Sequence, residues 1–218
     1  MIGILKNVYK KYRLWLRDVF IGQGMRERLI NKDFTIISCN CIGGLVYHDL
    51  KMEFLSPTIN LFIPPKDFIR FIKDIEYWVQ QPMIEIKDEE LRKKYSYPIV
   101  ELGENGVRVH LVHYNSVDEA QKKWNERVKR INWDKLFFVL DDRNGCDEKT
   151  VYEYDKLPYK NKVFFSHREY PDISCVCHIK GFEKDVHVGV MTAFVNPISC
   201  KRNYDQFDFV AWFNQVNK

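Results

Sequence analysis

The stretch that decides the fold is TIISCNCIGGLVYHDL, residues 35–50. Its first part, with Phe34 before it, is an apolar and β-branched run that is typical of a buried strand. The chain then turns through Asn40 and the pair Gly43-Gly44 and continues with apolar residues at helical spacing. A strand that passes through glycines into a helix is a common phosphate-binding place in α/β proteins. The glycines allow close approach, and the helix N-terminus offers free N–H groups.

Two interpretations of this turn stay open. The third glycine of the dinucleotide-binding fingerprint and the lysine of the P-loop are missing, so the glycines could serve only to pack the helix tightly on the strand. The functional interpretation makes Asn40, Cys41, Gly43 and Gly44 ligand-binding residues, and this is our prediction.

The composition is that of one folded α/β domain. The chain has 218 residues, and 45% of them are apolar, which is enough to bury a full core. The formal net charge is only +4, without the clustered basic excess of a nucleic-acid binder, so we expect no nucleic acid among the partners.

Six cysteines bear on the compartment. The sequence shows neither a signal peptide nor a membrane-spanning run, so we expect reduced thiols and a cytoplasmic protein. The cysteines include two Cys-x-Cys pairs, Cys39/Cys41 and Cys175/Cys177. Structural zinc sites usually space their cysteines more widely, so these pairs are expected to be buried free thiols, with metal binding as the alternative.

Residues 1–22 stand apart as a basic amphipathic helix, in which lysines and arginines alternate with large apolar residues that include Trp15 and Phe20. Such a helix can lie on an anionic membrane surface with its aromatic side chains at the interface. It can also pack its apolar face on its own domain or on a second subunit. Peripheral membrane contact and a homo-oligomer are therefore both open.

The remaining sequence, residues 23–218, predicts a single α/β domain in which strand and helix patterns alternate. We expect strands at 56–63, 135–140, 163–165 and 186–195, a hairpin of 98–102 with 107–111, and helices at 66–80, 147–156, 204–216 and from the Ser116 cap to Arg130. The fold class that follows is a three-layer α/β/α, Rossmann-like arrangement around a mixed, mostly parallel sheet with an antiparallel hairpin.

Polar residues follow several strands at their carboxyl ends. They are Asn40 and Cys41, His113, Asp141-Asp142-Arg143, and His167-Arg168. In open α/β sheets this edge holds the ligand crevice, although such residues also serve as simple caps and turns. We predict His167 as a ligand-binding residue and His48, His113 and Asp142 as catalytic, since acid–base chemistry needs such groups near the substrate.

Two charged groups would suit a diphosphate. Asp141 and Asp142 resemble the acidic pair with which many nucleotide-sugar glycosyltransferases hold a divalent metal, here Mg²⁺ or Mn²⁺. On the helix that ends near Arg130, Arg127 and Arg130 share one face and could clamp an anion. A solvated basic face is the alternative interpretation of that helix.

Several segments together resemble one known family. They are ISCNCIGG (37–44), SPTINL (56–61), the helix end at Tyr77, His113-Tyr114, Lys123-Trp124 with Arg127, RIN (130–132) and NKV (161–163). The family consists of uncharacterised bacterial domains whose members are often labelled exopolysaccharide biosynthesis proteins. The resemblance implies a Rossmann-like fold and a link to surface polysaccharide, and its segments bring Asn60 and Asn132 into the predicted ligand-binding set.

The sequence thus predicts a protein of exopolysaccharide or cell-surface polysaccharide biosynthesis, with a nucleotide sugar or a polysaccharide precursor as its ligand. The leading form of this prediction is a glycosyltransferase-like enzyme that acts on an activated sugar. A non-catalytic sugar- or nucleotide-binding accessory protein and an acyl-type transferase that modifies the polysaccharide are the alternatives.

Overall fold

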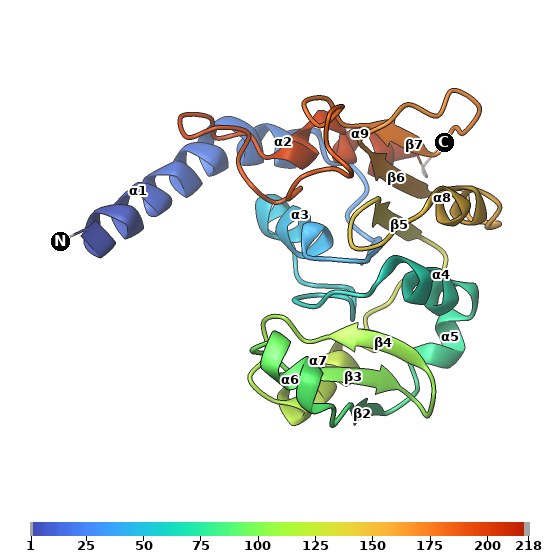
Figure 1. The fold of residues 1–218 in the computed structure, drawn as a ribbon. Helices are drawn as coiled ribbons and strands as arrows, with labels where there is room; N and C mark the ends of the chain where they lie inside the picture. The colour runs from blue at the N-terminus through green and yellow to red at the C-terminus, as the bar shows by residue number, and fades with distance from the viewer. Residues whose placement is uncertain (1, 216–218) are drawn as a thin grey trace.

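Four strands form a parallel sheet in the computed structural model, which describes residues 2–215 (Figure 1). They are β1 (Thr35–Ser38), β5 (Leu136–Asp141), β6 (Lys162–Ser166) and β7 (Val176–His178), in the spatial order β1-β5-β6-β7. In the register of the sheet, Ile37 lies opposite Phe138 and Leu140 opposite Phe164. Strands β1, β5 and β6 are buried on both faces, and their sequences are therefore almost continuous apolar runs.

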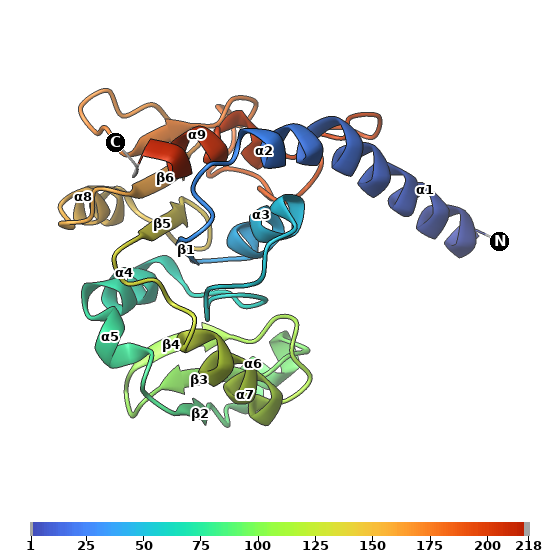
Figure 2. The same cartoon turned by 180° about the vertical axis from the view of Figure 1, so that it is seen from behind.

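The side chains of these strands alternate between two cores. Ile36 and Phe137 belong to one core, and Ile37 and Phe138 belong to the other. The first core includes residues of α2 (Gln23–Arg28), α3 (Ile42–Leu50) and α9 (Phe209–Asn214). The second core includes residues of α4 (Pro65–Lys73), α8 (Glu148–Asp155) and the second sheet. Figure 2 shows α2, α3 and α9 around one part of the parallel sheet and α4 between the two sheets.

A smaller antiparallel sheet lies beside this unit. It contains β2 (Met83–Glu85), β3 (Ile99–Leu102) and β4 (Val107–His110), accompanied by α5 (Ile75–Trp78), α6 (Glu89–Lys94) and α7 (Val117–Val128). The hairpin of β3 and β4 turns through Gly103 and Asn105, whose φ angles of +70° and +51° lie in the left-handed region. On α7, the indole N–H of Trp124 donates to the carbonyl of Val79, which ties the helix to the end of α5.

The predicted α/β class is confirmed, with parallel strands, a separate antiparallel hairpin and surrounding helices. The strands and helices that were expected between residues 98 and 165 form at those places. The hairpin joins β2 in a sheet of its own, apart from the parallel strands.

Two predicted strands are wrong. Residues 56–63 run in bends, because hydroxyl groups take the place of a strand partner: the N–H of Thr58 donates to Ser56 Oγ, and the N–H of Ser38 donates to Thr58 Oγ1. A single bridge, from Phe62 to His110, is formed there. Residues 186–195 form bends and turns with one bridge, from Phe194 to Arg202, and the N–H of Val188 donates to a carboxylate instead of a neighbouring strand.

Two predicted helices are interrupted. The helix expected at 66–80 is divided into α4 and α5 at Asp74, whose backbone is not helical (φ −142°, ψ 57°). The helix expected at 204–216 consists of a 3-10 turn (Asn203–Gln206) and α9, which Asp208 caps through the N–H of Ala211. Its last expected residue, 216, lies outside the described residues.

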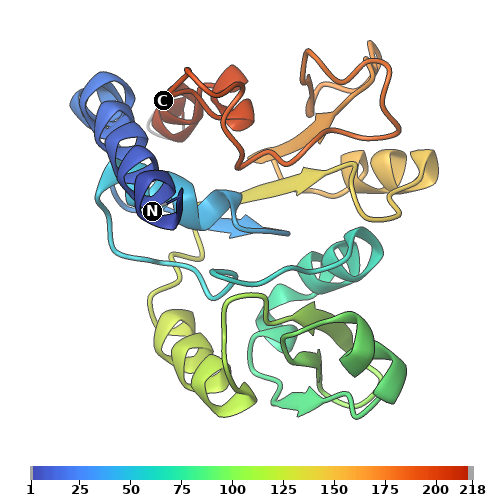
Figure 3. The same ribbon diagram turned by 60° about the vertical axis from the view of Figure 1, so that its left-hand side comes forward.

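The amino-terminal segment begins with α1 (Ile2–Arg17), continues through a π-helical segment (Asp18–Gly22) and enters α2. Helix α1 projects from the body of the protein in Figure 1, and in Figure 3 it is foreshortened because it points toward the viewer. Among the helices that the structure describes, none is both long enough and apolar enough to span a membrane.

Candidate functional site

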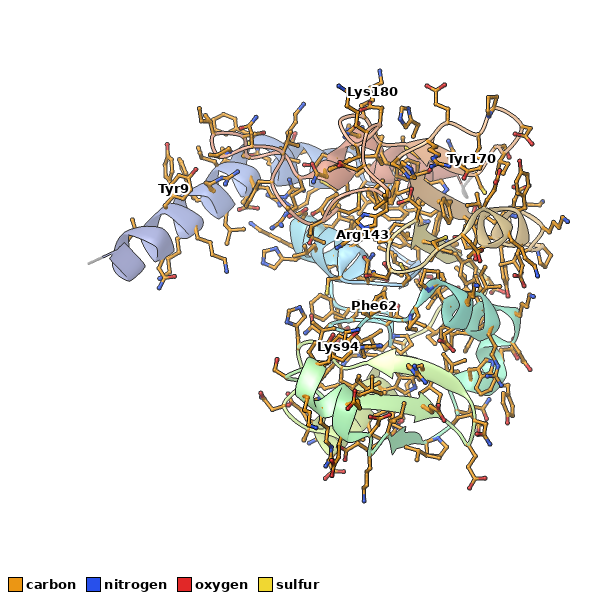
Figure 4. All side chains as sticks on the ribbon, in the orientation of Figure 1. Tyr9, Phe62, Lys94, Arg143, Tyr170 and Lys180 are labelled. Carbon is orange, nitrogen blue, oxygen red and sulfur yellow. The ribbon has the colours of Figure 1, made fainter. Side chains whose placement is uncertain are left out.

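A cavity of about 260 Å³ opens between the carboxyl end of the parallel sheet and the antiparallel sheet. It is lined by Asn40, Cys41, Phe62, Tyr95, Tyr97, His110, Val112, Arg143, Asn144, Met191 and Thr192. In Figure 4, Arg143 comes from the loop after β5 and Phe62 from the segment that runs toward the antiparallel sheet, so the cavity takes its two walls from the two sheets. The edge at which the sequence places the ligand crevice is therefore hollowed.

One wall of the cavity is aromatic. His110, the last residue of β4, lies 5.2 Å from the ring centre of Phe62, 5.2 Å from that of Tyr95 and 5.9 Å from that of Tyr97. The rings are tilted or edge-on to one another, which is the arrangement that aromatic quadrupoles favour. This wall offers the faces and edges of several rings to whatever enters.

The opposite wall is polar. Asn40 donates to a carboxylate oxygen of Asp141 at 2.7 Å and accepts the N–H of Ile42 at 3.0 Å, so its side chain ties the end of β1 to the end of β5. Arg143 and Asn144 follow β5 in a turn, where Asn144 has a φ of +59°. These residues bring one guanidinium and two amides to the cavity.

Two buried polar atoms beside the cavity lack a partner. Among the described residues, His110 Nδ1 and Arg143 Nε are buried without a hydrogen bond. Burial lowers the pKa of His110 to about 4, helped by the nearby charges of Arg108 and Lys94, so its ring is neutral at pH 7. Both atoms are closed off from solvent, and because an unpaired buried polar group is costly, a small shift of either side chain toward a bound molecule would gain a hydrogen bond.

Cys41 lines the same cavity, and burial raises the pKa of its thiol. Since the thiolate is the reactive form of cysteine, this side chain is a poor nucleophile at neutral pH. Cys41 therefore contributes shape and a weak polar contact to the cavity.

The two predicted metal ligands lie directly behind this wall. Burial raises the pKa of Asp141 to about 6. Asp142 uses both carboxylate oxygens. Its Oδ2 accepts from Ser166 Oγ at 3.2 Å and from the His167 N–H at 2.8 Å, and it contacts His167 Nδ1 at 2.5 Å. Its Oδ1 accepts from the Val188 N–H at 2.7 Å. The Asp142–His167 pair thus joins the ends of β5 and β6 to the loop at Val188.

This donor set does not fit a divalent ion. A metal would have to displace the hydrogen bonds that the Asp142 oxygens already accept. In the part of the chain that the structure describes, no three His, Cys, Asp or Glu side chains gather in a way that could hold a metal ion. The predicted roles of Asp141 and Asp142 as metal ligands, and of His167 as a ligand-binding residue, stay predictions without added support.

The glycine pair packs on its neighbours. A Cβ atom on Gly43 would lie 3.1 Å from Ser38 Cβ and 3.2 Å from Ile36 Cγ2, and one on Gly44 would lie 3.4 Å from Ile59. Gly43 therefore faces the strand that precedes it, which favours the close-packing interpretation of this turn. The residues that enter the cavity wall from this stretch are Asn40 and Cys41.

The basic helix face lies elsewhere. Arg127 is buried, donates to the hydroxyl of Tyr114 at 2.7 Å and has its guanidinium over the ring of Phe54. Arg130 pairs with Glu53 at 3.0 Å and donates to the carbonyl of Phe54. The structure therefore gives both arginines protein partners away from the cavity.

The other predicted residues are also apart from the cavity. The N–H of Asn132 donates to Thr35 Oγ1, at the start of β1, which is the opposite end from Asn40. Asn60 has a φ of +64°, and its carbonyl accepts the N–H of His113, whose side chain is exposed. His48 is exposed on α3 and lines a different hollow, formed with α1.

A larger hollow of about 660 Å³ lies at the opposite end of β6 and β7. The ammonium group of Lys162, the first residue of β6, lines this hollow but already donates to the carbonyl oxygens of Asp155 and Leu157. This edge is also the amino end of the parallel strands, where open α/β sheets do not place their ligands. The smaller cavity is therefore the better candidate site.

The sequence predicts part of the polar wall of the cavity and does not predict the aromatic wall. Asn40 and Cys41 were predicted, whereas Tyr95, Tyr97 and His110 were not. The spacing Tyr-Ser-Tyr after a charged segment was a visible signal, because ligand pockets are lined predominantly by apolar and aromatic side chains.

The molecule is therefore an α/β protein with a ligand-sized cavity at the carboxyl edge of its parallel sheet. The chain belongs to the family described as a domain of unknown function, DUF1919, whose model matches residues 14–214. An "uncharacterized protein" of Haemophilus influenzae is 40% identical to it over 197 residues, which is 90% of this chain and 92% of the relative. The expectation of an uncharacterised domain family is confirmed, and the exopolysaccharide label stays a prediction.

Proposed function

We propose that the cavity binds the sugar ring and adjoining phosphate of an activated sugar, and that the protein acts in cell-surface polysaccharide assembly. The single observation that supports this is the pairing of an aromatic wall with two unpartnered polar atoms, His110 Nδ1 and Arg143 Nε. Sugars present C–H faces that pack on aromatic rings and hydroxyl groups that need hydrogen-bonding partners. A guanidinium is well suited to the phosphate that activates the sugar.

The size of the cavity limits what it can hold. Its volume of about 260 Å³ lies just below the roughly 300–1,000 Å³ of pockets that enclose drug-sized ligands. A monosaccharide with one phosphate fits this space, whereas a complete nucleotide sugar would extend out through the open mouth. We therefore expect the sugar part to be recognised more strictly than the nucleotide.

Binding is expected not to need a divalent metal, because both carboxylate oxygens of Asp142 already accept hydrogen bonds from the protein. This observation favours the accessory, sugar-binding form of the proposal over a metal-dependent glycosyltransferase.

The six cysteines are free, which supports a reducing, cytoplasmic location.

Calorimetry on two arginine variants tests this function. The titrants are sugar 1-phosphates and nucleotide sugars, each with and without Mg²⁺, and free sugars serve as the uncharged comparison. We expect Arg143→Met to weaken binding by roughly 1.5–3 kcal/mol, or about tenfold to more than a hundredfold, because a hydrogen bond to a charged group is lost. Arg130→Met is the matched control, since Arg130 is paired with Glu53.

Two outcomes would count against this function. If Arg130→Met abolishes binding and Arg143→Met does not, the ligand site is the basic face of α7. If no titrant binds with or without Mg²⁺, the activated-sugar proposal fails. Tyr97→Ala separates the aromatic contribution, because it removes part of the ring wall and leaves Arg143 in place.

A further inference from the structure

Helix α1 presents its apolar face away from the rest of the protein. Val8, Tyr12 and Trp15 recur at spacings of four and three residues, so they lie on one side of α1, and Val19 follows four residues later in the π-helical segment. Their exposed fractions are 60%, 55%, 57% and 38%, and Phe20 is 70% exposed. Surface helices normally turn such a stripe toward the core, and here the orientation is reversed.

Arginines on the other side of α1 hold it in this orientation. Arg17 is buried and pairs with Asp49 and Asp205, each at 2.6 Å. The guanidinium of Arg13 lies 3.9 Å from the ring centre of Phe194. A rotation of α1 that buried its apolar stripe would break these contacts, so the exposed stripe is a fixed feature of the fold.

The loop after Phe194 lies against the arginine side of α1 and adds exposed apolar side chains of its own. The hydroxyl of Tyr9 donates to the carbonyl of Pro197, which holds the loop against α1, and Figures 1 and 2 show the loop beside the helix. Within this loop Val195 is 52% exposed and Ile198 is 91% exposed. We call residues 7–20 together with residues 194–199 the amino-terminal face.

Charge and residue type identify what could cover this face. No acidic residue occurs between Ile2 and Arg17, and the side chains of Lys10 and Lys11 are exposed. Tryptophan and tyrosine are favoured at the boundary between water and lipid, whereas coiled-coil partners place Leu, Ile or Val along such a stripe. We propose that the amino-terminal face docks on an anionic phospholipid surface, with the aromatic stripe at the acyl boundary and the lysines at the headgroups.

Vesicle co-sedimentation of the full chain tests this proposal. The vesicles are phosphatidylcholine alone and phosphatidylcholine with phosphatidylglycerol. We expect binding to the anionic vesicles that falls as salt rises, because the Debye length shortens. The Trp15→Ser/Phe20→Ser variant should lose roughly tenfold in partition for each aromatic side chain removed. Lys10→Gln/Lys11→Gln should weaken binding to the anionic vesicles alone.

The control is Tyr77→Ser, an equally exposed aromatic position on α5, at the other end of the molecule (Figure 1). It should bind vesicles like the wild type. Sedimentation velocity without lipid follows each variant, because a second copy of the chain is the rival occupant. Equal binding of wild type and Trp15→Ser/Phe20→Ser overturns the proposal. So does a lipid-free dimer that Trp15→Ser/Phe20→Ser dissociates, if the wild type shows no vesicle binding.

Discussion

At the scale of single residues, Asp141 and His110 should shift stability with pH in opposite directions. Burial raises the pKa of Asp141 from 3.8 to about 6, so its stabilising effect is present below about pH 4 and is lost as the pH rises through 6. Burial lowers the pKa of His110 from 6.5 to about 4, so its effect is present above about pH 6.5 and is lost as the pH falls through 4. The two effects partly cancel in the wild type.

Urea unfolding of Asp141→Asn across this pH range separates them. An asparagine cannot ionise, so from about pH 4 to pH 7 the variant should gain on the order of 3 kcal/mol relative to the wild type. His110→Gln should show the opposite trend, becoming relatively more stable as the pH falls. A constant difference between Asp141→Asn and the wild type at all these pH values would show that Asp141 ionises normally in the folded protein.

Single residues also show how far the site could be predicted. Asn40 and the pair Asp141-Asp142 were placed at the correct edge, because parallel strands deliver their carboxyl ends together. What the pattern could not reveal is that Arg143 lines the same cavity as Tyr97 and His110. Tyr97 and His110 come to the cavity through tertiary contacts between segments that are far apart in the sequence, and no local spacing encodes them.

At the scale of elements, the two glycines of α3 provide a matched test of the strand-to-helix turn. Gly44→Ala should be neutral or stabilising by up to about 1 kcal/mol, because its Cβ meets Ile59 at an ordinary distance and alanine favours the helix. Gly43→Ala should cost roughly 1–3 kcal/mol by overpacking, since its Cβ would press on Ser38 and Ile36.

Equilibrium urea unfolding of both variants measures this difference. Both variants replace glycine by alanine at adjacent positions of one helix. The gain in helix propensity is therefore the same in both and cancels in the comparison. If Gly43→Ala gains as much stability as Gly44→Ala, Ser38 and Ile36 can move enough to accommodate the added methyl group, and the turn is a plain connector.

Elements were predictable where one signal dominated. Apolar runs identified β1, β5 and β6, and the capping side chain of Ser116, which accepts the N–H of Glu119, marked the start of α7. Residues 56–63 have the composition of a strand, but Ser56 and Thr58 bond to nearby backbone and compete with a ladder. An apolar pattern predicts a strand from composition alone. It does not indicate which backbone group a serine or threonine hydroxyl will bond to.

At the scale of the whole molecule, one arginine joins three distant parts of the chain. Arg17 ends α1, Asp49 lies near the end of α3, and Asp205 belongs to the 3-10 turn near the carboxyl end. The hydroxyl of Tyr204 also donates to Asp49, at 2.8 Å. Burial opposes the charge of Arg17, but hydrogen bonds to Asp205 and Asp49 more than compensate, so the pKa of the guanidinium is raised. The amino-terminal helix is thus fastened through a buried ionic cluster.

Arg17→Met should therefore destabilise the protein by about 3–5 kcal/mol, because it leaves Asp49 and Asp205 without their cation in a buried place. Arg28→Met is the control: its partner Asp208 is half exposed, and such surface pairs contribute at most about 1 kcal/mol. Urea unfolding at neutral pH measures both. The loss should shrink when Asp49→Asn is added, since the second change removes one of the stranded charges. Equal small losses in Arg17→Met and Arg28→Met would mean that water reaches the cluster, and that α1 is held in place by the contacts of Arg13 and Tyr9 instead.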